Sequence, residues 1–133
     1  ASVGTFADAA RFAEVVFNCT NGRHSLAALR AAGSGLLGRK ILIDVANPLS
    51  GDMPPSLAVC NTDSLAEQIQ REFPDVRVVK ALNTVNCDVM VNPRLVDGRH
   101  QLFICGDDHG AKEVVVRLQE DVRELIQQNP GVF

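Results

Sequence analysis

Short apolar runs alternate along the chain with segments in which apolar residues recur every three or four positions. The strand-like runs are EVVFNCT (14–20), KILIDVANP (40–48), VRVVKAL (76–82) and QLFICG (101–106). The segments between them have the period of amphipathic helices. Such alternation is typical of βαβ units, so we expect an α/β fold built on a parallel sheet.

Local signals mark where the helices begin and end. Two sites have the spacing of a capping box, in which a Ser or Thr is followed three residues later by an acidic side chain: Thr5 with Asp8, and Ser64 with Glu67. An Asp before the last periodic segment is a favourable N-cap. We therefore predict helices after Thr5, from about Ser25 to Ala32, after Ser64, and from Asp107 or Asp108 to about Gln128. The segment NTVNCDVMVNP (83–93) is predicted to be a short helix or a turn.

Composition restricts the class of protein. The chain has 133 residues, of which 46% are hydrophobic, so residues 1–133 are expected to form a single domain with its own core. Thirteen basic and sixteen acidic residues give a net charge of −3, and no basic run is interleaved with aromatic residues, which argues against a nucleic-acid partner. No apolar stretch reaches the roughly 18 residues of a membrane span, and no signal peptide pattern is visible. We expect a soluble, cytoplasmic protein without a membrane partner.

The four cysteines are Cys19, Cys60, Cys87 and Cys105, and no two of them form a C-x-x-C pair. Each lies in or beside an apolar segment, so we interpret them as reduced thiols buried as small hydrophobic side chains. The three histidines show no ligand spacing either. The sequence thus predicts no metal site.

Small uncharged polar residues follow three of the predicted strands, in the sequences NCTNG, VANPL and LNTVN. In open parallel α/β sheets, ligands bind outside the carboxyl ends of the strands. An asparagine amide both donates and accepts hydrogen bonds, so it can bind ribose hydroxyls or a carboxamide without a charge that would repel phosphate. The alternative is that these residues cap the helices that follow.

The segments ILIDVANPL, SLAEQIQREFPDVRVVKALNTV and LFICGDDHGAKEVV resemble the NADP oxidoreductase family that includes the deazaflavin (F-420)-dependent enzymes. This resemblance implies a doubly wound, Rossmann-like NAD(P)-binding domain. It also implies direct hydride transfer between NADPH and a small-molecule acceptor or donor. The positions that match the family's cofactor site, facing the nicotinamide half and the hydride partner, are Thr20, Asn21, Asn47, Pro48, Asn83 and Thr84.

One feature of the family is missing from these residues. Gly33, Gly35 and Gly38 fit the pattern G-x-G-x-x-G, but they follow a helix and precede a strand, which is the reverse of the order that binds a pyrophosphate. We interpret them as a loop. In the family, the fingerprint belongs to a strand and helix upstream of the position of Ala1. We therefore expect a parallel sheet without the first βαβ unit, poor NADP binding and impaired catalysis.

The sequence identifies no catalytic residue. Asp44 and Lys80 are the ionisable residues nearest the strand ends, but Asp44 lies within a strand and is expected to accept hydrogen bonds from neighbouring backbone or a helix end. His24 is expected to be a solvated residue at a helix start. A second function therefore competes with the reductase: a non-catalytic remnant that binds a partner or itself. The strand 14–20 corresponds to the fourth in the Rossmann order 3-2-1-4-5-6, so its edge would be open, and we expect a homo-oligomer.

Overall fold

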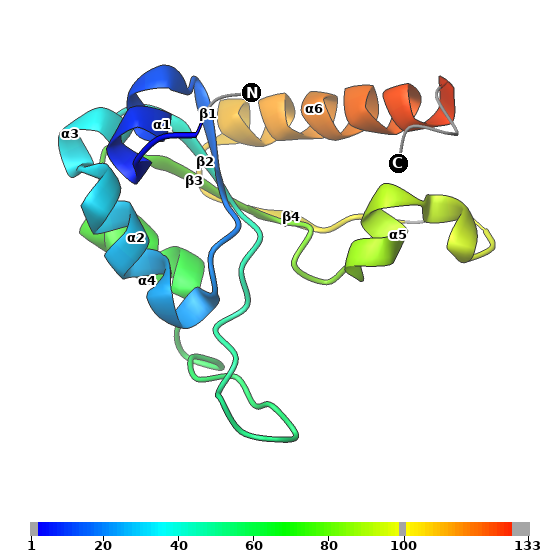
Figure 1. The fold of residues 1–133 in the computed structure, drawn as a ribbon, viewed down its shortest axis with the longest axis horizontal. Helices are drawn as coiled ribbons and strands as arrows, with labels where there is room; N and C mark the ends of the chain where they lie inside the picture. The colour runs from blue at the N-terminus through cyan, green and yellow to red at the C-terminus, as the bar shows by residue number, and fades with distance from the viewer. Residues whose placement is uncertain (1–2, 99–100, 129–133) are drawn as a thin grey trace.

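A four-stranded sheet forms the centre of the protein, for which a computed structural model describes residues 3–98 and 101–128 (Figure 1). The strands are β1 (Val15–Asn18), β2 (Ile41–Asp44), β3 (Arg77–Ala81) and β4 (Ile104–Cys105), and they lie in this order across the sheet. β1 to β3 are parallel, whereas β4 pairs antiparallel to β3. The predicted α/β class is confirmed, but the reversed direction of β4 was not anticipated.

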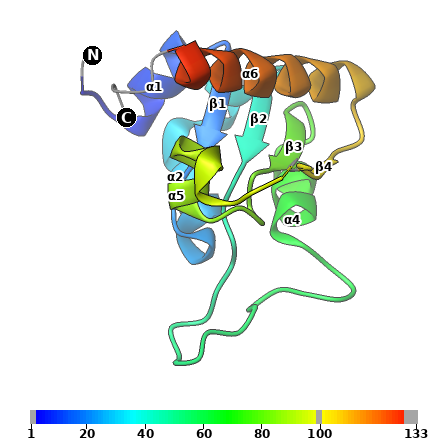
Figure 2. The same cartoon turned by 90° about the vertical axis from the view of Figure 1, so that its right-hand side faces the viewer.

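Helices cover both faces of the sheet, as the doubly wound prediction requires (Figures 1 and 2). On one face lie α1 (Phe6–Phe12), α2 (Ser25–Ala32), the one-turn α3 (Ser34–Leu37) and α4 (Leu65–Glu72). On the other face lies α6 (His109–Gln128), whose 20 residues give it a length of about 30 Å. Shorter elements are the 3-10 turns η1 (Gly22–His24) and η2 (Pro93–Leu95) and the helix α5 (Cys87–Val91).

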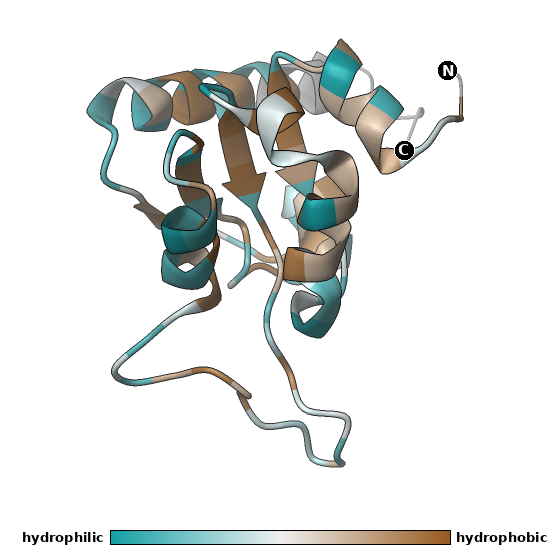
Figure 3. Ribbon diagram, turned by 90° about the vertical axis from the view of Figure 1, so that its left-hand side faces the viewer, coloured by the Kyte–Doolittle hydropathy of each residue, from teal (hydrophilic) through white to brown (hydrophobic). Residues whose placement is uncertain are grey.

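The core divides into two clusters because successive strand residues point to opposite faces. Leu42 and Val78 pack against α1 to α4, and Ile43 and Val79 pack against Ala111 and Val115 of α6. All four residues of β2 are buried, as expected for a strand with helices on both sides. Figure 3 shows the contrast between the apolar strands in the centre and the helices around them, in which polar and apolar residues are mixed.

The first predicted capping box is complete and the second is only half formed. Thr5 Oγ1 accepts from Asp8 N, and the Asp8 carboxylate accepts in return from Thr5 N. At α4, Ser64 Oγ accepts from Glu67 N, but Ser64 N donates to Asp63 instead of to Glu67. The neighbouring aspartate therefore takes the place predicted for Glu67.

The remaining helix predictions agree with the structure apart from one segment. α2 has the predicted bounds, and Asp108 Oδ1 accepts from Ala111 N at the start of α6. The glycine-rich segment 33–38 is not entirely a loop, because α3 forms within it. It still follows a helix and precedes β2, so the order of elements excludes a strand-to-helix phosphate turn at this place.

The prediction that the cysteines are buried is wrong, since Cys19, Cys60, Cys87 and Cys105 are all exposed free thiols. Each lies where the core ends. Cys19 follows the outermost strand β1, Cys60 lies in the connection between β2 and α4, and α5, which contains Cys87, buries none of its residues. Cys105 belongs to the two-residue strand β4 at the opposite edge.

The edge of β1 is open among the described residues, where β1 pairs only with β2. The side chain of Phe17 is 52% exposed at this edge. This agrees with the predicted position of the strand, while its pairing with a second chain stays a prediction. No helix within residues 3–98 and 101–128 has both the length and the apolar character to cross a bilayer.

Candidate site at the carboxyl edge of the sheet

The loops after β1, β2 and β3 meet at one edge of the sheet because these three strands run in the same direction. The loop after β1 contains Thr20 and Asn21, the loop after β2 contains Asn47 and Pro48, and the loop after β3 contains Asn83 and Thr84. Beyond Pro48, the connection to α4 extends away from the sheet (Figure 2).

The first two loops touch through Gly22. A Cβ atom on this residue would lie 2.4 Å from Asn47 O and 2.5 Å from Pro48 N, closer than real Cβ atoms approach a backbone. Gly22 and Pro48 are both buried. The peptide between Asn47 and Pro48 therefore lies against the η1 turn in a space that only glycine leaves open.

The second and third loops are joined by a pair of asparagines. Asn47 Nδ2 donates to Asn83 O at 2.8 Å, and Asn83 Nδ2 donates to Asn47 Oδ1 at 3.3 Å. Both side chains are half-buried. Leu82, just before Asn83, has a φ of 63°, a left-handed conformation that is uncommon for a residue with a branched side chain and marks a position under local strain.

The other four predicted residues behave differently from one another. Thr20 Oγ1 donates inward to Asn18 Oδ1 at 2.6 Å. Asn21 Oδ1 accepts from Arg23 N, so this residue caps η1 as the alternative interpretation expected. Pro48 is buried and its carbonyl accepts from Ala58 N, whereas Thr84 is exposed. His24 is exposed at the start of α2, as predicted.

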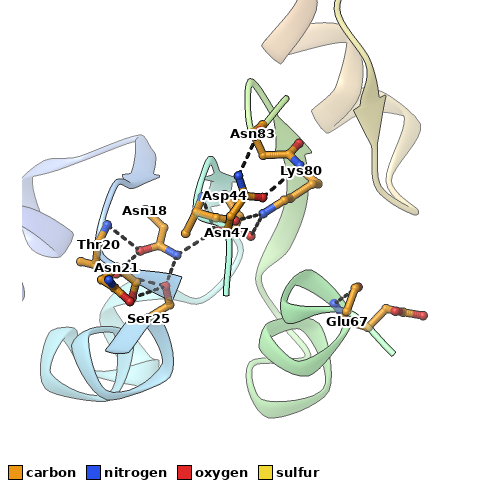
Figure 4. A network of polar contacts seen from close by, with 11 residues as sticks. Asn18, Thr20, Asn21, Ser25, Asp44, Asn47, Glu67, Lys80 and Asn83 are labelled. Atoms are coloured by element: carbon orange, nitrogen blue, oxygen red, sulfur yellow. Dashed lines mark hydrogen bonds and ion pairs between the residues drawn. The ribbon is translucent and has the colours of Figure 1, made fainter. Parts of the chain in front are cut away.

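A buried polar cluster lies directly behind these loops, and Figure 4 shows its side chains pointing toward one another from three strands. Asn18 Nδ2 donates to Asp44 Oδ1 at 2.8 Å, and Lys80 Nζ donates to Asp44 Oδ2 at 2.7 Å. Asp44 is fully buried, and the Lys80 side chain is 17% exposed. The backbone donor expected for Asp44 is present in Ala46 N, whereas the two side-chain donors were not anticipated.

Asn18 is the residue that the sequence analysis missed. It is 3% exposed, and it also donates to Ser25 Oγ, the first residue of α2, at 2.9 Å. The available signal was its position as the last residue of an apolar strand that faces a helix start. In the segment NCTNG, Thr20 and Asn21 lie after the apolar run and are therefore the more obvious polar candidates.

The arrangement offers neutral hydrogen-bonding groups at its surface and a paired charge beneath it. Asp44 and Lys80 neutralise each other, so the edge presents amides, hydroxyls and backbone groups and would not repel an anionic ligand. Within the described part of the chain, no three His, Cys, Asp or Glu side chains are placed to hold a metal ion.

An ion pair beside the start of α4 changes the pKa of one of its members, Asp63. Arg71 Nη2 lies 2.8 Å from Asp63 Oδ2. Hydrogen bonds from Arg71 and Gln68 lower the pKa of Asp63 from its ordinary value of 3.8 to about 2.

Known proteins resemble this chain over most of its length. The F420-dependent NADP reductase of Methanocaldococcus jannaschii is 30% identical over 122 residues, which cover 86% of this chain and 52% of the reductase. Metalloreductase STEAP3 of Rattus norvegicus is 38% identical over 80 residues, which cover 59% of this chain and 15% of that protein. No protein-family model matches the chain.

A solved structure supports the same relationship. The crystal structure at 1.70 Å resolution of a provisionally named F420-dependent NADP reductase from Arthrobacter sp. FB24 superposes with a TM-score of 0.85 and 51% identity. The match covers 90% of this chain and 55% of that one. The chain thus spans about half the length of these two reductases. The resemblance predicted from the sequence is confirmed: this Rossmann-like chain is related to the NADP oxidoreductase family that has F420-dependent members.

Proposed function

We propose that the loops after β1, β2 and β3 form the nicotinamide side of an NADP site, in a reductase domain that transfers a hydride between NADPH and a small-molecule partner. The nicotinamide would carry the hydride, so the protein has to bind, orient and exclude water. Two relatives are named as F420-dependent NADP reductases, which makes F420 the first hydride partner to test.

One observation carries the proposal: three parallel strands deliver their polar loops to the same edge, and the loops contact one another there. The contact of Gly22 with the Asn47 backbone and the bonds between Asn47 and Asn83 hold the edge together. Ligands in open α/β sheets bind at this kind of edge. The names of the two reductase relatives favour NADP as this ligand.

The asparagines fit such a ligand better than they fit the alternative of capping. Asn21 caps a turn, but Asn47 and Asn83 bond to each other between two loops. Asn83 sits in a turn after a strained residue, Leu82, and strained backbone is concentrated at functional sites. We assign Asn47 and Asn83 to the nicotinamide carboxamide and ribose, with Thr20, Asn21, Pro48 and Thr84 completing the surface.

The test is a titration with NADPH, monitored by NMR through the side-chain amide signals of Asn47 and Asn83. This method detects dissociation constants in the millimolar range. Asn83→Ala should weaken binding about 2- to 10-fold, the loss of roughly one hydrogen bond. Its effect on the free energy of unfolding should be below about 1 kcal/mol.

A matched control removes an asparagine that only caps. Asn92 Oδ1 accepts from Arg94 N at the start of η2. Asn92→Ala should cost stability without changing NADPH affinity. If Asn83→Ala lowers the melting temperature and leaves NADPH affinity unchanged, Asn83 is structural and the proposed site is wrong.

A second candidate function rests on the open edge of β1. Phe17 on this strand is half-exposed, and Phe12 at the end of α1 is 93% exposed. A strand with one open edge beside exposed aromatic residues is a template for pairing with another chain. Self-association of the chain, with no catalytic role, would use this edge and not the polar loops.

A further inference from the structure

We propose that the buried cluster of Asn18, Asp44 and Lys80 positions the three loops of the nicotinamide side, so that these residues set cofactor affinity without touching the cofactor. The inference rests on the proposed function, because it concerns the same edge. It assigns a role to ionisable residues that the sequence left without one.

The first argument is the way in which the ion pair holds the backbone of one residue, Ala46. Ala46 N donates to Asp44 Oδ1 at 3.3 Å, and Lys80 Nζ donates to Ala46 O. The Ala46 backbone is therefore bonded on both sides by the two members of the pair. The next residue is Asn47, so the direction in which its side chain leaves the loop is set by Asp44 and Lys80.

The second argument is that Asn18 extends the same control to the first loop. Its Oδ1 accepts from Thr20 N and from Thr20 Oγ1, while its Nδ2 donates to Asp44 and Ser25. Ser25 Oγ in turn contacts Asn21 O at 3.4 Å. An amide with every one of these bonds in place cannot rotate without breaking several of them.

The third argument concerns energy. Burying an ion pair is costly, and replacing such a pair with apolar residues is often neutral or stabilising. A pair that joins two strand ends at a candidate site, and a third through Asn18, is therefore better explained by the geometry that it fixes. Lys80 is bonded to both Asp44 and Ala46, which leaves it poorly placed to act as a proton donor to a ligand.

The experiment separates stability from affinity. Asp44→Asn alone would leave Lys80 without its counter-charge and should be strongly destabilising. The double variant Asp44→Asn/Lys80→Met removes both charges and should recover much of that stability. We expect its affinity for reduced nicotinamide mononucleotide, measured by NMR on the 133-residue chain, to stay at least about tenfold below wild type.

A second ion pair provides the matched control. Arg30 and Glu72 join α2 to α4 through two hydrogen bonds of 2.5 and 2.7 Å, away from the strand ends. Arg30→Met/Glu72→Gln should leave the affinity for the mononucleotide unchanged. If Asp44→Asn/Lys80→Met does not fold, Lys80→Arg tests the positioning role instead. It keeps the positive charge, but its planar guanidinium cannot reproduce both bonds of the ammonium group, to Asp44 and to Ala46 O.

The outcomes distinguish this inference from the proposed function. If Asn47→Ala and Asn83→Ala do not change binding, the site itself is wrong. If those variants weaken binding but Asp44→Asn/Lys80→Met or Lys80→Arg binds like wild type, the positioning role is wrong and the proposed site stands. Weak binding by a variant that has regained stability supports positioning.

Discussion

Replacing Gly22 with alanine tests whether contact between the first two loops shapes the site. The added Cβ would lie 2.4 Å from Asn47 O, whereas carbon and oxygen ordinarily approach to about 3.3 to 3.6 Å. The backbone at Asn47 and Pro48 would therefore have to move by about 1 Å. The bonds that join Asn47 to Asn83 are already 2.8 and 3.3 Å long, so a displacement of this size breaks them unless the third loop follows.

The expected cost of Gly22→Ala is that of forcing extra volume into a packed interior, about 1 to 3 kcal/mol. In a domain of this size, that corresponds to a fall in melting temperature of roughly 3 to 10 °C. The side-chain amide signals of Asn47 and Asn83 should shift in the NMR spectrum without any ligand. The affinity for reduced nicotinamide mononucleotide should fall in parallel.

Gly35 is the matched control because a Cβ on it would meet nothing within 4 Å and it lies in α3. Gly35→Ala should stabilise the chain by about 0.5 to 1 kcal/mol, since alanine is the better helix former. The reasoning fails if Gly22→Ala melts at the wild-type temperature with unchanged Asn47 and Asn83 signals. In that case the loops are not held by this contact.

Three further predictions follow from the charges and the sheet. Residues 1–133 alone should bind NADPH more weakly than the low micromolar range, about −8 kcal/mol, in calorimetric titration, because no G-x-G-x-x-G stands between a strand and a helix in the described residues. Tighter binding would mean that another loop holds the phosphates. Sedimentation should detect self-association through β1, and a monomer with slowly exchanging amides over residues 15–19 contradicts it. Asp63→Asn should destabilise the chain at neutral pH but have no effect below about pH 2. The pKa of Asp63 is lowered in the folded chain, so its carboxylate stabilises the fold above the unfolded pKa of 3.8. This contribution is lost as the pH falls to about 2. An effect of Asp63→Asn that is the same at both pH values refutes the pairing with Arg71.

Elements defined by local chemistry were predictable from the sequence. Thr5 and Asp8 satisfy each other within one helical turn, and Asp108 needs only the amide of Ala111. The positions of β1, β2 and β3 were predictable as well, because each strand is a short apolar run within its own segment. Boundaries differed mainly because polar strand-end residues such as Thr20 and Asn47 leave the sheet earlier than the apolar pattern suggests.

Features decided by contact between distant segments were not predictable. β4 pairs antiparallel to β3, and nothing in QLFICG indicates this direction. After β4, Gly106 lies so close to β3 that a Cβ on it would be 2.6 Å from Val78 O. The cluster of Asn18, Asp44 and Lys80 depends on strand register, so each residue looks unremarkable in its own segment. Exposure of the cysteines follows from where the sheet and its helices end.

The long sequence separation within the buried cluster has a consequence for folding. Asn18 and Asp44 are 26 residues apart, and Asp44 and Lys80 are 36 residues apart, yet they are register partners in adjacent strands. Both crossover connections must close before the cluster can form, and such non-local closure slows folding. A slip of one residue would turn Asp44 to the opposite face of the sheet and leave a carboxylate among apolar side chains. The cluster therefore disfavours misregistered sheets, and the polar loops reach their native arrangement only in a sheet of the native register.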